Sequence, residues 1–156
     1  MTTTSSPVPD AAYGVLLRDK PESELDDVAE QVKRLGYALL DSGLSTAELS
    51  QLSDAFERTR ADYVQTWGEA RLRSANEFHT VRAPLTHGDP VFMRLATNGN
   101  LMAVLGKLIV GKFILNQQNG VINPPGETYN QGAWHRDLPY QHYVSSSPLA
   151  VNSLFC

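Results

Sequence analysis

The two stretches FILNQQNGVINPPG (residues 113–126) and WHRDLPYQHY (residues 134–143) decide the fold expected for this chain. The first opens on three apolar residues and is predicted to form a strand as far as Ile122. Asn-Pro-Pro-Gly then has turn chemistry, because proline and glycine favour tight bends. The second stretch and residues 149–156 are further strand candidates, and residues 37–40 offer a shorter one upstream. The last part of the chain is therefore predicted to be β structure.

The first half of the sequence has the periodicity of helices. Residues 22–35 place apolar side chains three and four positions apart, which predicts an amphipathic helix. Gly36 follows at the position where helices commonly end in a glycine. Ser45 and Glu48 have the spacing of a capping box, in which each residue satisfies a backbone N–H of the other. This box predicts the start of a helix that runs to about residue 66.

Two shorter helices are expected further along the chain. Residues 68–89 mix Arg, Asn, His and Pro without a clear period, and we expect them to be irregular. Asp89 followed by a proline has the chemistry of a helix start, which predicts a short helix over residues 91–96. Asn98 is expected to cap a second helix over residues 99–108.

Helices are thus expected first and strands afterwards. This order indicates an α+β protein, with helices on the outside of an antiparallel sheet or barrel. A length of 156 residues suits one domain with a substantial core. We expect residues 1–12, which are rich in Thr, Ser and Pro, to form a disordered tail, and residues 13–156 to belong to a single domain.

The composition argues against some classes of partner and indicates a cellular compartment. The net charge is -4 and the chain has no block of Lys or Arg, which argues against nucleic acid or anionic membrane as a main partner. The N-terminus lacks the basic and apolar regions of a signal peptide. The longest apolar run, residues 101–115, is interrupted by Gly and Lys and cannot span a bilayer. Cys156 is the single cysteine, so we expect no disulfide framework and a cytoplasmic location.

The triplet His135-Arg136-Asp137 is the main candidate for chemistry. On a strand, residues two apart point to the same face and lie about 6.6 Å apart along the chain. An imidazole nitrogen and a carboxylate oxygen can then converge on one metal ion, while Arg136 points to the opposite face. A third ligand, usually a distant His, completes a site with open positions of the kind that suits Fe(II). The bland alternative is a surface His–Asp pair.

The same spacing occurs at His87-Gly88-Asp89, which shows that the triplet alone is a weak signal. Context separates the two. Asp89 is followed by a proline and looks like a turn entering a helix, so a helix cap is the favoured interpretation there. Asp137 instead lies in a strand-like run between Trp134 and Tyr143, beside another predicted strand.

A wider pattern resembles the phytanoyl-CoA dioxygenase family over most of residues 22–156. Residues 36–41 and 44–49 resemble the N-terminal opening of that family. The block from Gln118 through Pro125-Gly126 to Gln141 is similar to its first iron-binding strand and the approach to it, and residues 151–156 are similar to the next strand. The resemblance implies a double-stranded β-helix of the jelly-roll or cupin-like kind. It also implies Fe(II), 2-oxoglutarate and dioxygen acting on a small organic substrate, with succinate and CO₂ as co-products.

The resemblance assigns roles residue by residue. His135 and Asp137 are the expected iron ligands and catalytic residues. Gln118 and Asn152 are expected to line the cavity and to touch the cosubstrate or substrate; the alternative, which the sequence slightly favours, is an ordinary strand amide bonded to neighbouring backbone. The remaining candidates are better explained structurally: Trp134 by packing, His142 as a half-exposed structural residue rather than a substrate contact, and His79 as a surface loop residue rather than part of a lid.

The chain ends at residue 156, and the family pattern continues beyond that point. The second iron His and the Arg that pairs with 2-oxoglutarate come from later strands in that family, and no residue here matches them. We therefore expect this sequence to be the N-terminal portion of a longer enzyme. A catalytically silent cupin-like binding module and a regulatory α+β domain with a surface His–Asp pair are the alternatives. Halogenation is disfavoured, because it requires a small residue in place of Asp137. The identity of the substrate and the oligomeric state are left open by the sequence.

The 156-residue chain on its own is predicted to bind Fe(II) weakly and to form no succinate. A metal ligand is missing, and so is the Arg that anchors the cosubstrate carboxylate by a bidentate contact. The measurement is succinate released from 2-oxoglutarate in the presence of Fe(II) and oxygen. Succinate formed by this chain above a metal-free control would contradict the prediction.

Overall fold

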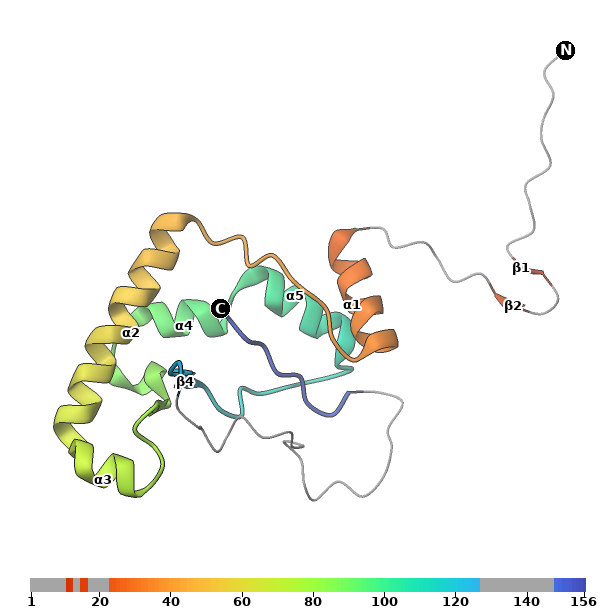
Figure 1. Ribbon diagram of the computed structural model, residues 1–156. Helices are drawn as coiled ribbons and strands as arrows, with labels where there is room; N and C mark the ends of the chain where they lie inside the picture. The colour runs from red at the N-terminus through yellow and green to blue at the C-terminus, as the bar shows by residue number, and fades with distance from the viewer. Residues whose placement is uncertain (1–10, 13–14, 17–22, 127–147) are drawn as a thin grey trace, which may run out of the picture.

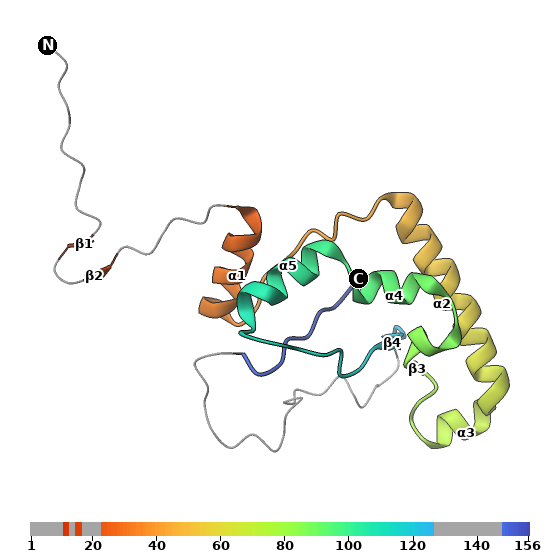
Figure 2. The ribbon, with the colours of Figure 1, turned by 180° about the vertical axis from the view of Figure 1, so that it is seen from behind.

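The structure, a computed structural model, describes residues 11–12, 15–16, 23–126 and 148–156. Helices predominate in this part of the chain, and its strands are two or three residues long. The long helix α2 stands along one side, and α4 and α5 run roughly in line from α2 toward α1 (Figures 1 and 2). The elements in chain order are β1 (Ala11–Ala12), β2 (Val15–Leu16), α1 (Glu24–Leu35), α2 (Thr46–Trp67), α3 (Glu69–Ser74), β3 (Thr80–Arg82), the 3₁₀ helix η1 (Pro84–His87), α4 (Pro90–Ala96), α5 (Gly99–Leu108) and β4 (Asn119–Val121).

One apolar cluster holds α1 against α5. Its buried members come from both helices, and partly buried side chains from three non-helical segments pack around it. The helix α1 begins at Ser23, whose hydroxyl accepts a hydrogen bond from the Asp26 N–H, and ends at Gly36 in the left-handed conformation, with φ of 84°. We call the four buried residues the α1–α5 cluster: Val28, Ala29, Val104 and Leu108.

A second apolar cluster joins α2 to α4. The capping box at the start of α2 is complete, since Ser45 accepts from the Glu48 N–H and the Glu48 carboxylate accepts from the Ser45 N–H. Farther along α2, Ala55 is almost fully buried against α4. We call the three buried residues the α2–α4 cluster: Ala55, Val91 and Phe92.

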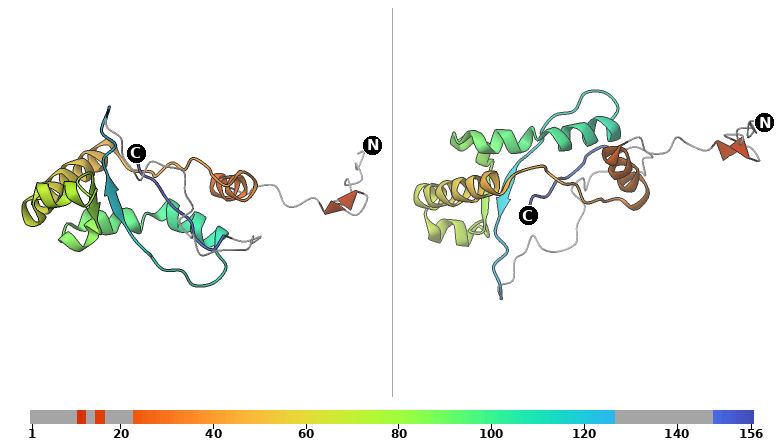
Figure 3. Two further views of the ribbon diagram at one scale, coloured as in Figure 1. Left: turned by 60° about the horizontal axis from the view of Figure 1, so that its bottom comes forward. Right: turned by 90° about the horizontal axis from the view of Figure 1, so that it is seen from above.

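The described strands form two small antiparallel pairs, β1 with β2 and β3 with β4. In the second pair Thr80 lies opposite Val121 and Arg82 lies opposite Asn119. The pair of β3 and β4 lies beside α2 (Figure 3). Because α2 packs on β3, this contact connects the helices to the segment that leads toward residue 126.

The predicted helices are confirmed closely. The helix α1 ends at Gly36, α2 opens on the Ser45–Glu48 box and reaches Trp67, and α4 and α5 begin at the expected caps Asp89 and Asn98. Each of these signals acts within one turn of helix, so it depends little on the rest of the fold.

Several predictions about the other segments were wrong. Residues 68–89 are not irregular throughout, because they contain α3, β3 and η1. The strand predicted from residue 113 to residue 122 is confirmed only at β4, where β3 supplies a partner. Residues 37–40 and 149–156 form no strand, since a strand requires a neighbour for its hydrogen bonds and the described residues provide none there. The candidate at residues 134–143 lies outside the described residues.

The larger architectural predictions stay predictions. A mixed arrangement of helices and a small antiparallel pair is what the described residues contain, and it neither includes nor contradicts a double-stranded β-helix. The predicted disordered tail, residues 1–12, lies outside the description apart from Ala11 and Ala12, which pair with β2. Among the helices described, none combines the length and apolarity needed to cross a membrane.

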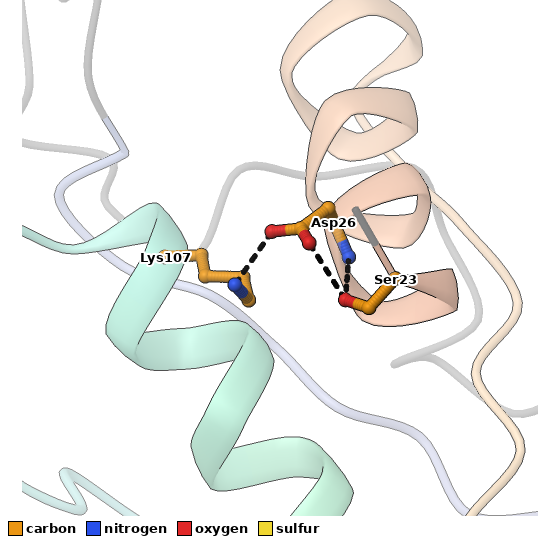
Figure 4. A network of polar contacts seen from close by, with 3 residues as sticks. All are labelled: Ser23, Asp26 and Lys107. Atoms are coloured by element: carbon orange, nitrogen blue, oxygen red, sulfur yellow. Dashed lines mark hydrogen bonds and ion pairs between the residues drawn. The ribbon is translucent and has the colours of Figure 1, made fainter. Parts of the chain in front are cut away.

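A polar network ties the first turn of α1 to the last turn of α5 (Figure 4). The Lys107 ammonium donates to one oxygen of the Asp26 carboxylate at 2.5 Å, and the Ser23 hydroxyl donates to the other at 2.6 Å. The Lys107 hydrogen bond, followed by that of Ser23, holds the pKa of Asp26 below its ordinary value. The carboxylate therefore stabilises the docking of α1 on α5 only in its charged form.

Asn98 connects α5 to a distant part of the chain. Its side-chain oxygen accepts from the Leu101 N–H at 3.0 Å, and its amide nitrogen donates to the Ser42 carbonyl at 2.8 Å. Beside it, Asn100 donates to the Asp41 carbonyl at 2.9 Å. The loop between α1 and α2 is thus fixed to the start of α5 by two amide side chains.

Replacing Asn98 should destabilise the fold in two separable steps. Asn98→Ser keeps a capping oxygen but loses the donor to Ser42, whereas Asn98→Ala loses both. We expect Asn98→Ala to lower the free energy of unfolding by about 1 kcal/mol more than Asn98→Ser does, the usual loss for a helix cap. Urea unfolding followed by circular dichroism measures both variants, and equal losses would contradict a capping role.

Acid should weaken the α1–α5 contact through Asp26. Because the folded-state pKa is lowered, the stabilisation is present above the ordinary pKa of about 3.9 and is lost as the pH falls through the folded value. Asp26→Asn should therefore reduce the slope of unfolding free energy against pH below about pH 4. Lys107→Met should do the same, since it removes the largest cause of the shift. Unchanged slopes in both variants would rule out this linkage.

Candidate functional site on the approach to His135 and Asp137

The proposed iron ligands themselves lie outside the described residues, as do Trp134 and His142. What the structure describes is the chain that leads toward them. The strand β4 is followed by the predicted turn, which is confirmed at Pro125 and Gly126, where Gly126 has φ of 78°. The described part of the candidate site therefore consists of the elements that hold β4 in place.

Gln118 attaches the start of β4 to two other elements. Its side-chain nitrogen donates to the Phe92 carbonyl in α4 at 3.0 Å, and its side-chain oxygen accepts from the Leu85 N–H in η1 at 3.1 Å. Its own carbonyl accepts from the Ala83 N–H at 2.9 Å. These are backbone contacts of the kind given above as the alternative to cosubstrate binding. A second N–H and a second lone pair of the amide are not used by these bonds, so cosubstrate contact stays a prediction.

The corner at Ala83 is a further constraint on this strand. Ala83 has φ of 46°, in the left-handed region that residues with a side chain seldom adopt. Its N–H is bonded to Gln118, and its carbonyl accepts from both the N–H and the hydroxyl of Thr86, at 2.9 and 2.8 Å. Three hydrogen bonds therefore hold the conformation at the start of η1.

A close approach between Gly120 and Phe56 places β4 on α2. A methyl group added at Gly120 would overlap the Phe56 ring, so the strand reaches this position only because residue 120 has no side chain. A glycine within a strand pattern often marks such an approach. Sequence reasoning did not use this signal, and it also missed β3, whose three residues are too few to show an alternation.

Asp89 occupies the helix-cap position that its context predicted, and His87 is the last residue of η1. The Asp89 carboxylate accepts from the Val91 N–H at 3.0 Å, which caps α4, and it pairs with Arg58 of α2 at 3.1 Å. The bond from Val91 contributes most to a lowered pKa of Asp89, and the contact with Arg58 contributes further. The His87 ring meets Tyr63 edge-on, with centroids 5.7 Å apart. The preferred interpretation, a cap rather than a metal site, agrees with this geometry.

The other two candidates, His79 and Asn152, lie on different segments of the chain. His79 immediately precedes β3; its carbonyl accepts from the Ile122 N–H at 2.8 Å and its ring lies edge-on to Phe78. Asn152 is exposed and follows Val151, which packs on the α1–α5 cluster. Among the residues that are described, no three His, Cys, Asp or Glu side chains come together as a possible metal site. His135 and Asp137 lie outside the described residues, so this absence says nothing about their role.

Comparison with known proteins gives two relatives and no family. Uncharacterized protein Rv1501 of Mycobacterium tuberculosis and uncharacterized protein Mb1539 of Mycobacterium bovis are each 26% identical to this chain over 138 residues. The alignment covers 85% of this chain and 50% of each relative, so the chain spans about half the length of the curated relatives that it matches. No known family model and no solved structure matches the chain.

Filling the space at Gly120 should loosen β4 from α2. Gly120→Ala is expected to lower the free energy of unfolding by about 1–3 kcal/mol, as overpacking commonly does. Phe56→Leu in the same chain should recover part of this loss, because it withdraws the ring atoms that the methyl group meets. Thermal unfolding of the two single variants and the double variant forms the cycle, and purely additive losses would contradict the contact.

Proposed function

We propose that the protein is a non-haem Fe(II)- and 2-oxoglutarate-dependent dioxygenase of the phytanoyl-CoA dioxygenase kind, acting on a small organic substrate. The observation that carries the proposal is the triplet His135-Arg136-Asp137, set after a Pro-Gly turn in a run with strand character. The turn at Pro125 and Gly126 follows β4, and β3, η1 and α4 hold this strand in place, which supports the proposal. A cytoplasmic location belongs to the same proposal.

The donor set fits the metal chemically. A neutral imidazole and a carboxylate are two of the three ligands in the two-His-one-carboxylate arrangement, which binds Fe(II) and leaves positions open. When bound, iron and 2-oxoglutarate would supply oxidation by dioxygen, with succinate and CO₂ as co-products. The side chains of His135 and Asp137 would hold the ion from one face of a strand, and Arg136 would lie on the other face.

The described residues would serve this site by fixing the strand that approaches it. Gln118 ties the strand to η1 and α4, while Gly120 allows it to lie close to α2. A ligand pair functions only when it is held in a narrow range of positions. The strand β4 is fixed both by helices and by its partner strand β3, so it is a suitable support for the proposed ligands.

Anaerobic spectroscopy of the protein at its full natural length tests the proposal. Fe(II) and 2-oxoglutarate together should give a weak visible charge-transfer band, and His135→Ala and Asp137→Ala should each abolish it. The matched control is His87→Ala, which removes an imidazole from the other triplet of the same spacing and should leave the band unchanged.

Two outcomes would contradict the proposal. A flat spectrum from the unaltered protein would indicate a silent binding module or a structural domain. Loss of the band in the His87 variant as well as in the His135 variant, with both proteins folded, would show that the band does not report the proposed ligands.

A further inference from the structure

The guanidinium of Arg60 has no acidic partner in the described part of the chain. Arg60 lies on α2 beside Phe78, in the segment that returns from α3 to β3 (Figure 1), and its guanidinium carbon is 5.4 Å from the centre of the Phe78 ring. None of the carboxylates described forms an ion pair with it. Even Glu57, three positions earlier on the same helix, is exposed and unpaired with Arg60. A half-buried positive charge is therefore left without compensation.

The surrounding sequence makes this region positive within an acidic chain. Residues 58–82 contain five arginines, no lysine and three acidic residues, whereas the whole chain has a net charge of -4. Three of these arginines have an acidic partner, in the pairs Arg58–Asp89, Arg73–Glu69 and Arg82–Glu77. The charges of Arg60 and Arg71 are left over, and a local excess of positive charge attracts anions.

The hydrogen-bonding groups of Arg60 are also unsatisfied. Its Nε atom is buried, and no described residue accepts a hydrogen bond from it. Its two Nη atoms have no acceptor among the described residues either, but they are not sealed from solvent. A buried polar group without a partner is rare in native proteins, and one of its common causes is an ion or water that binds nearby. The buried Nε fixes the guanidinium, so its Nη edge is presented to solvent in a defined position.

The Phe78 ring compensates the charge of Arg60 only in part. A cation is attracted to the face of an aromatic ring when it lies within about 6 Å of the ring centre, so Arg60 is near the limit of this range. The guanidinium of Arg73 lies over the same ring at 3.7 Å and occupies the closer position. Arg73 is also neutralised by Glu69, at 2.7 Å. The contact with the ring therefore does not replace a counter-ion for Arg60.

We propose that Arg60 binds a small oxyanion, a carboxylate or phosphate group, on the side of α2 that carries Phe78. The planar fork of a guanidinium matches two oxygens of either group, and charge-assisted bonds of this kind are stronger than those between neutral groups. The two Nη atoms donate to the anion, while the contact with Phe78 and the buried Nε keep the guanidinium in place. The site requires no iron and does not rest on the proposed function.

Calorimetric titration of the protein with phosphate and, separately, with acetate tests this site, at an ionic strength held constant with sodium chloride. Arg60→Gln should weaken the affinity at least about tenfold, because a charged hydrogen-bonding partner is lost. Arg60→Lys keeps the charge but loses the planar fork, so it should also bind more weakly than the unaltered protein. Arg71→Gln is the matched control. Arg71 likewise has no ion pair among the described residues, but it stacks on the half-exposed Trp67 ring, and its loss should leave the affinity unchanged.

Two calorimetric results would overturn the inference: equal affinities of Arg60→Gln and the unaltered protein, or no binding of either anion to the unaltered protein. Binding of acetate would identify carboxylates as ligands, and binding of phosphate alone would restrict the ligand to phosphate groups; both results support the site.

If Arg60→Gln does not fold, nuclear magnetic resonance of the unaltered protein with isotope-labelled arginine decides. The buried Nε–H should give the arginine signal that exchanges most slowly with water, and this signal should shift saturably on addition of the anion. A slowly exchanging signal that responds to neither anion would show that the contact with Phe78 alone accounts for Arg60, and would overturn the inference. A protein that fails the spectroscopic test for iron would still bind the anion, so the two tests fail independently.

Discussion

The described structure depends on satisfying the backbone groups where its helices begin. Four helices start at a side chain that accepts from a backbone N–H, namely those of Ser23, Ser45, Asp89 and Asn98. Two of these caps also reach elsewhere: Asp89 pairs with Arg58 on α2, and Asn98 donates to the Ser42 carbonyl. Asp89 and Asn98, which cap helix starts, therefore also set how the helices are placed, and this matters in a domain whose two apolar clusters are small.

The same constraint explains which elements the sequence could predict. The capping box at Ser45 and the cap at Asp89 are decided by residues within four positions, and both were located correctly. The strand over residues 113–122 was not, because a strand forms where another strand lies opposite, and β3 lies opposite residues 119–121 alone. The three residues of β3 have no pattern long enough to detect. Local chemistry thus predicts helix starts well and strand extents poorly.

The same distinction between local signals and contacts over long sequence distances applies to the candidate site. Two triplets with identical spacing were separated by context, and the structure agrees for His87 and Asp89, since Asp89 caps α4. For Gln118 the sequence could not identify a partner, because Leu85 and Phe92 lie 33 and 26 residues away along the chain. Gly120 did carry a usable signal, as an isolated glycine in a strand pattern. The roles of His135 and Asp137 depend on residues distant in sequence, so the triplet supports a proposal about them and no more.

The left-handed corner at Ala83 has a consequence for how the strand pair comes apart. A non-glycine residue in this conformation is less stable by about 1–2 kcal/mol, and it persists only while its neighbours hold it. One of the bonds that hold it comes from Gln118, whose amide also binds Leu85 and Phe92. When that residue detaches, the corner loses one of the three hydrogen bonds that hold it and Leu85 in η1 loses its bond to the same residue, which weakens the partner to which the strand would return. Detachment of β4 is thus expected to be cooperative, involving η1 and the strand as one unit rather than fraying residue by residue.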